Sequence, residues 1–154
     1  MRKRVRLIAK EIIDNSFPVL KERRIFYLVI WFRFFGLSVW IPPFIRIIVI
    51  STRIKKLNAK AMRGIIAHEL CHQEKYLEMS ILQYINFATK YLFSKKARML
   101  EEKDTDRLAI EKGYGRALYE LSLISRTDSG HKKIIDNYMS PEDIKGYAIK
   151  TGKW

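Results

Sequence analysis

The sequence predicts a single α+β domain over residues 1–154, in which a small, mainly antiparallel sheet packs against helices. Two observations lead to this expectation. Apolar residues recur at helical spacing near the N-terminus and again after residue 57, and the stretch between is rich in aromatic and β-branched residues. A content of 48% hydrophobic and 30% charged residues excludes disordered and low-complexity proteins, and the single cysteine excludes a disulfide-stapled scaffold.

The first expected element is an amphipathic helix that ends near residues 14–16. Its apolar residues share one face of the helix, whereas basic residues occupy the rest: Val5, Ile8, Ala9, Ile12 and Ile13. No continuous apolar segment with a cleavage site follows, so a secretory signal is not expected. We expect this helix to pack on the core; the alternative is a basic helix that lies on anionic lipid.

Residues 25–50 form the most apolar stretch and raise the question of a membrane span. Arg33 is the only charge between Ile25 and Ile45, over nearly the length of about 20 residues that a span requires. Gly36, the Pro42-Pro43 pair and the β-branched composition argue against a spanning helix. We therefore expect strands at about 26–34, 37–41 and 44–52.

The rest of the chain reads as helical. Asn58 is a good N-cap for a helix that runs to about Glu74. Further helices are expected over 76–93, 95–112 (ending at Gly113) and 116–124, then a turn at 127–130 and a last helix opened by Ser140-Pro141.

Charge is concentrated in the first part of the chain. The net charge is +14, and residues 1–63 hold 15 Lys and Arg against 3 acidic residues. A regional basic surface of this kind suits phosphate or anionic lipid. We expect an anionic membrane surface to be a partner of the basic N-terminal region, and nucleic acid is the less favoured partner.

His68-Glu69-Leu70-Cys71-His72 is the motif that carries chemistry. Residues four apart share one helix face, so His68 and His72 can bind one Zn²⁺ while Glu69 lies beside the water on the metal. A catalytic zinc usually has a third protein ligand, and acidic candidates follow on the helix at 95–112: Glu101, Glu102, Asp104 and Asp106. Helical periodicity favours Glu101 and Glu102 almost equally as the third ligand.

These residues resemble a known family. Residues 65–72, residues 102–109 and Gly113-Tyr114 look like the H-E-x-x-H and later E-x-x-A-D-x-x-A signatures of gluzincin peptidases related to HtpX and the CAAX prenyl endopeptidase. The resemblance covers about residues 47–115. No segment between His72 and Glu102 reaches spanning length without charge, so the chain is most similar to the small minigluzincins.

The resemblance implies a zincin-like fold and a zinc metallopeptidase. Position by position, it makes His68, His72 and Glu102 the metal ligands, Glu69 the general base, and Asp106 a carboxylate that holds a ligand histidine. Zinc would then activate water for the hydrolysis of a peptide or protein substrate, with Glu69 taking the proton. A cytoplasmic protein, peripheral to the membrane, is expected.

Two residues depart from the family pattern. Thr105 stands where alanine is usual, which leaves the ligand spacing intact. Cys71 stands where glycine is common, and we expect it to be a buried, small apolar residue rather than a ligand. An oxyanion-stabilising residue is also expected, and the sequence offers His131, Tyr114 and Tyr138 without deciding among them.

Other functions stay open. A regulatory zinc protease of the ImmA/IrrE kind also combines H-E-x-x-H with a later glutamate. A protein of a different class, which binds membranes or nucleic acid through its basic surface and holds a structural zinc, is the second alternative. The segment from about 131 to 154 lies outside the resemblance and is a candidate regulatory tail that keeps the enzyme latent, with Glu142, Asp143 and Trp154 as the residues that suggest it.

Overall fold

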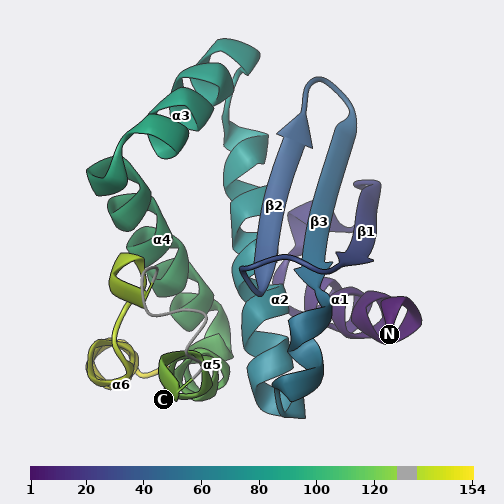
Figure 1. Cartoon of the computed structure of the whole chain (residues 1–154). Coiled ribbons are helices and arrows are strands. Elements are labelled where there is room, and N and C mark those ends of the chain that lie inside the picture. The colour runs from purple at the N-terminus through teal and green to yellow at the C-terminus, as the bar shows by residue number, and fades with distance from the viewer. Residues whose placement is uncertain (128–134) are drawn as a thin grey trace.

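Helix α2 (Ala59–Lys75) lies at the centre of the molecule, between the sheet and the C-terminal helices (Figure 1). The computed structural model describes residues 1–127 and 135–154. Asn58 caps α2 as the sequence predicts, because its side-chain oxygen accepts a hydrogen bond of 2.8 Å from the Ala61 amide. Most of α2 is buried, so the side chains of the metal motif are held within packed surroundings.

The sheet has three strands, β1 (Ile25–Ile30), β2 (Gly36–Ile41) and β3 (Ile45–Ser51), in the order β1-β3-β2. All three expected strands are therefore present. Strands β2 and β3 form an antiparallel hairpin, but β1 runs parallel to β3. The expectation of a mainly antiparallel sheet is wrong, because residues 31–35 carry the chain across the end of the sheet and leave β1 on the far side of β3 (Figure 1).

Helix α1 (Arg2–Ser16) packs on the core, as expected. Val5, Ala9 and Ile12 are fully buried on the face that contacts α2 and β1. Arg63 of α2 donates two hydrogen bonds to the Glu11 carboxylate, at 2.8 and 2.9 Å, and so ties the two helices together at the surface.

The C-terminal half consists of α3 (Ile81–Phe93), α4 (Lys95–Ala109), α5 (Gly115–Thr127) and α6 (Pro141–Lys150). The helix expected over 76–93 is interrupted, because Ser80 and Gln83 form a reciprocal cap that starts α3 anew. Between α4 and α5 the chain kinks at Gly113, whose φ of +93° favours glycine. The expected end of the helix over 95–112 near this residue is thus confirmed.

Helix α6 belongs to the core of the fold. Ser140 caps it as predicted, and Ile144 and Ala148 are buried against α5. The turn expected at 127–130 falls mostly outside the described residues, and so does His131. Among the described residues no helix is both long and apolar enough to cross a membrane.

Candidate metal centre

Two helices bring the sequence-predicted site residues together. His68, Glu69 and His72 come from α2, and Glu102 and Asp106 come from the neighbouring α4. All five side chains are buried, with exposed fractions of 5% or less. Residues four apart share one helix face, so His68 and His72 face α4 and Glu102 and Asp106 face α2, whereas Glu69 lies against Gly36 of β2.

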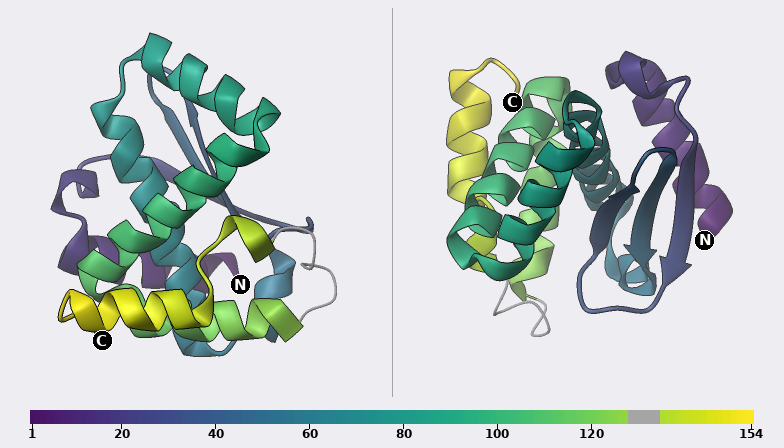
Figure 2. Two further views of the ribbon diagram at one scale, coloured as in Figure 1. Left: turned by 90° about the vertical axis from the view of Figure 1, so that its left-hand side faces the viewer. Right: turned by 90° about the horizontal axis from the view of Figure 1, so that it is seen from above.

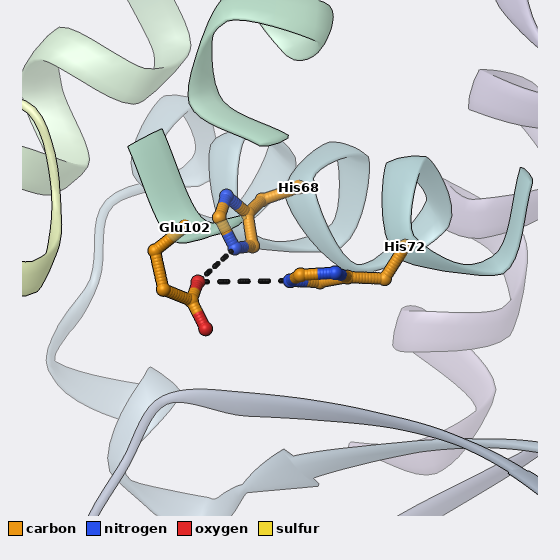
Figure 3. A group of neighbouring side chains, drawn as sticks. All are labelled: His68, His72 and Glu102. Atoms are coloured by element: carbon orange, nitrogen blue, oxygen red, sulfur yellow. Dashed lines mark hydrogen bonds and ion pairs between the residues drawn. The ribbon is translucent and has the colours of Figure 1, made fainter. Parts of the chain in front are cut away.

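His68, His72 and Glu102 point their donor atoms at one another (Figure 3). Glu102 Oε2 lies 2.9 Å from His68 Nε2 and 3.6 Å from His72 Nε2. One donor atom from each residue falls within 4.8 Å of the others. Glu102, and not Glu101, therefore belongs to the group that could hold a metal ion, a choice that helical periodicity alone left open.

This donor set fits a zinc ion. Zinc bonds of 2.0–2.1 Å in tetrahedral geometry place neighbouring ligand atoms about 3.4 Å apart, and the two separations at Glu102 Oε2 fall on either side of that value. Two imidazoles and a carboxylate form a borderline-soft ligand set of the kind that zinc prefers. Three protein ligands leave a fourth position for water.

Asp106 orients the first of the two histidines. Its Oδ1 lies 2.9 Å from His68 Nδ1, and its Oδ2 accepts a 2.9 Å hydrogen bond from the Met139 amide. With Nδ1 bonded to Asp106, His68 Nε2 is the nitrogen that faces Glu102 and the metal position; it donates to Glu102 when protonated and would give up that proton to bind a metal. Asp106 thus lies where the role implied for it requires.

His72 is held by a different group of residues, which the sequence analysis did not identify. Glu101 Oε1 lies 3.4 Å from His72 Nδ1 and 2.6 Å from Lys75 Nζ. Thr105 Oγ1 is 3.5 Å from the same His72 nitrogen and donates to the Glu101 carbonyl at 2.9 Å. The spacing of Lys75 after His72 and of Thr105 after Glu101 is the signal that could have identified this group.

Tyr91 of α3 holds the third candidate ligand from the other side. Its hydroxyl donates to Glu102 Oε1, which leaves Oε2 directed at the two histidines. Burial opposes the charged carboxylate, but hydrogen bonds from His68 and His72 prevail and hold the pKa of Glu102 far below its usual range. Glu102 is therefore an anion at neutral pH.

The pKa values of the two histidines are shifted in the opposite direction, upward. Burial disfavours the charged imidazole of His68, yet hydrogen bonds to Asp106 and Glu102 outweigh it and raise its pKa well above 6.5. The pKa of His72 is also raised, against burial, by Glu101 and Glu102. Paired carboxylates therefore surround each imidazole, an environment that equally suits a bound cation.

Glu69 differs from the other site residues in one of its carboxyl oxygens. Its exposed fraction is 3%, and its Oε2 has no hydrogen-bond partner within the described part of the chain. Ser38 of β2 donates to the backbone carbonyl of Glu69 at 2.7 Å and fixes this turn of α2 against the sheet. Burial raises the pKa of the Glu69 carboxyl above its ordinary value, which favours a group that accepts and returns protons.

Tyr138 and Met139 cover the His68 side of the site. The Tyr138 ring centroid lies 5.7 Å from that of His68, and the Met139 amide binds Asp106. Of the oxyanion candidates, Tyr138 is thus near the site, whereas Tyr114 lies against Phe17 and Ser16 on the side of α1. A largely apolar cavity of about 60 Å³ adjoins the site; residues that line it include Gly36, Ile65, Asp106, Leu118, Tyr138 and Met139.

The residues that suggested a blocking tail lie elsewhere. Trp154 packs edge-on against Tyr119 of α5, with ring centroids 5.3 Å apart. Asp143 belongs to the N-terminal cap of α6, and Glu142 is exposed. Within the described tail, contact with the metal centre comes from Tyr138 and Met139.

Cys71 is a core residue, as expected. It is fully buried, packs in the hydrophobic cluster and is absent from the group of residues that could hold a metal. Burial raises the pKa of its thiol well above the ordinary value, so a zinc-binding thiolate is disfavoured in this position.

Comparison with known proteins leaves the site to be interpreted from its own geometry. No protein-family model, curated protein or solved structure matches the chain. The likeness to gluzincin peptidases therefore depends on the motif residues and on the arrangement of the five side chains described above.

Proposed function

We propose that the protein is a zinc-dependent endopeptidase of the gluzincin type. The observation that carries the proposal is the convergence of His68, His72 and Glu102 beside a buried glutamate, Glu69, whose Oε2 has no hydrogen-bond partner in the described chain. A structural zinc site has four protein ligands and no need of such a group. Three donors beside a buried carboxylate with one unbonded oxygen instead favour catalysis.

The ligand residues would hold the metal with little rearrangement. Zn²⁺ bound by His68, His72 and Glu102 would lower the pKa of a water molecule and polarise a peptide carbonyl. Asp106 and Tyr91 support this arrangement, because they fix the free nitrogen of His68 and the free oxygen of Glu102.

Glu69 is the proposed general base. Its Oε2 would take the proton from the attacking water and return it to the leaving amine. The raised pKa of Glu69 supports both halves of this role, since a carboxyl with a pKa nearer neutrality exchanges protons more readily at physiological pH. Gly36 lies directly against the Glu69 carboxyl and leaves room for it.

Substrate access requires movement of the covering residues. Tyr138 and Met139 lie against His68 and Asp106, and the ligand side chains are almost inaccessible to solvent. This supports a latent enzyme, in which displacement of residues 137–139 opens the site.

The test is hydrolysis of an unstructured protein such as casein, and of a pool of quenched fluorescent peptides, by zinc-loaded protein. Wild type and Glu69→Gln are compared, each also in the Tyr138→Ala background in case the cover blocks entry. We expect zinc in all four proteins and hydrolysis only in those with Glu69. Equal hydrolysis with and without Glu69 would reject the proposed base, and no hydrolysis by either zinc-loaded Glu69 protein would reject the peptidase.

A further inference from the structure

The outer face of the sheet is apolar apart from Ser51, which is fully buried at the end of β3 and donates a hydrogen bond to the Phe32 carbonyl. Side chains alternate between the two faces of a strand, and those at even positions of β1 and odd positions of β2 and β3 point away from α2. We call the apolar members of this set the outer sheet face: Phe26, Leu28, Ile30, Leu37, Val39, Ile41, Ile45, Ile47 and Val49.

Strand register joins these side chains into rows. Val49 lies between Leu28 and Leu37, and Ile41 lies opposite Ile45. Leu37, Ile41 and Ile45 are each 41–48% exposed, although a partly polar pattern is typical of a strand with one solvated face.

No described helix covers the outer sheet face. Helices α1 and α2 contact the opposite side of the sheet (Figure 1), and the view from above shows both of them on the same side of the strands (Figure 2). The hairpin tip extends the apolar area, since Phe44 is 84% exposed. A contiguous group of exposed apolar side chains is typical of an interaction site.

The charge of the segment that forms the sheet and its connections is of one sign. There is no Asp or Glu from Arg23 to His68. The Arg24 guanidinium lies 5.1 Å from the centre of the Phe26 ring, at one border, and Arg33 is exposed in the connection at the end of β1. An apolar centre bordered by Arg24 and Arg33, in a segment without carboxylates, complements an anionic, apolar partner.

We propose that the outer sheet face docks on an anionic membrane surface. The aliphatic side chains and Phe44 would enter the boundary between headgroups and acyl chains, while Arg24 and Arg33 meet lipid phosphates. A second copy of the chain is disfavoured because two basic borders and two net charges of +14 would repel. Nucleic acid is disfavoured because the centre of the face has no hydrogen-bond donors for phosphates or bases.

The proposal differs from the one based on the N-terminal helix. Leu7 is the exposed apolar residue of α1, at 59%, on the other side of the sheet. Membrane docking by the outer sheet face also does not depend on zinc, so its test is independent of whether the protein has peptidase activity.

The experiment is co-sedimentation of the full-length protein with vesicles of phosphatidylcholine alone or mixed with phosphatidylserine. We expect binding to the mixed vesicles, weaker in high salt, and little binding to phosphatidylcholine. The triple variant Leu37→Thr, Ile41→Thr, Ile45→Thr should reduce the vesicle affinity about tenfold or more, because three apolar side chains are lost from the docking face. Threonine keeps the strand propensity, and an unchanged melting temperature verifies the fold.

Two variants serve as matched controls. Ile149→Thr removes an apolar side chain of similar exposure, 57%, from α6, and Leu7→Thr does so on α1. Neither should change vesicle binding. The proposal is overturned if mixed vesicles are not bound, if the triple variant binds like wild type, if Leu7→Thr alone abolishes binding, or if the triple variant instead dissolves a dimer seen by sedimentation velocity.

Discussion

Gly36 of β2 lies directly against Glu69 of α2, so closely that a Cβ at residue 36 would come within 2.2 Å of Glu69 Oε1. The atoms in the way are at the end of a flexible side chain, so Gly36→Ala should displace the carboxyl rather than unfold the protein. We expect retained zinc and peptide hydrolysis reduced about 100-fold, since a misplacement of about 1 Å costs that much. Zinc content and kcat/KM measure the two effects, and unimpaired hydrolysis would contradict the role of Glu69.

Alanine substitutions at Gly64 and Gly146 should have opposite effects on the free energy of unfolding. A Cβ at residue 64 would meet the backbone oxygen of Ala117 at 2.5 Å, whereas one at residue 146 would meet nothing within 4 Å. We expect Gly64→Ala to destabilise the protein by about 1–3 kcal/mol, because α2 and α5 must separate. Gly146→Ala should stabilise it by roughly 0.5–1 kcal/mol through helix propensity. Urea unfolding measures both, and equal effects of the two substitutions would be inconsistent with the close packing of α2 on α5.

Substitutions of Tyr138 distinguish a ring that covers the site from a hydroxyl that takes part in catalysis. If its ring covers the site, Tyr138→Ala should raise kcat/KM severalfold while Tyr138→Phe leaves it unchanged, because phenylalanine keeps the ring that lies 5.7 Å from His68. We expect this pattern. A fall in kcat with both substitutions would instead assign the hydroxyl to oxyanion stabilisation.

Truncation after about Thr127, the obvious way to test a blocking tail, should fail for a structural reason. It removes Ile144 and Ala148, which are 2% and 0% exposed, and uncovers α5. We expect the truncated chain to unfold or aggregate, as measured by circular dichroism. A folded and more active truncated protein would show instead that α6 is dispensable.

The metal-free protein should be most stable in mildly acidic solution. The folded pKa values of His68 and His72 are raised, so their contribution is complete below their ordinary value of 6.5 and is lost as pH rises through the raised values. The folded pKa of Glu102 is lowered, so its contribution is complete above about 4.5 and is lost as pH falls through the lowered value.

Urea unfolding after chelation tests this dependence. The free energy of unfolding should be higher at about pH 5.5 than at about pH 8, and Glu102→Gln should flatten the difference. With zinc the order should reverse, because protons compete with the metal for the imidazoles. A metal-free protein that gains stability between these two pH values would contradict the shifts.

The sequence predicts the local structure of each segment better than it predicts which segments pack side by side. Asn58 and Ser140 correctly predict where α2 and α6 begin, because an N-cap depends only on residues within one helical turn. Ser80 and Gln83 hold a similar signal that the apolar pattern around them obscured. The parallel pairing of β1 with β3 could not be predicted, since alternation defines the two faces of a strand and not which strand lies beside it.

In the candidate site, too, the sequence predicts what lies within one helix and not how separate segments meet. The H-E-x-x-H spacing identifies His68, Glu69 and His72, because one helix turn fixes their relation. Choosing Glu102 over Glu101 requires the rotation of α4 against α2, which helical periodicity does not determine. Tyr91, Tyr138 and Gly36 reach the site from three other segments, and only the tertiary arrangement brings them there.

Metal content tests the central claim most directly. Protein purified without added zinc, and again after reconstitution, is measured by elemental analysis for wild type, Glu102→Ala and Glu101→Ala. We predict about one zinc per chain in wild type, loss in Glu102→Ala, and retention in Glu101→Ala with affinity reduced about 10-fold to 100-fold, since Glu101 only holds His72. A folded wild type that takes up no zinc, or a Glu102→Ala variant that binds zinc like wild type, would contradict the metal centre.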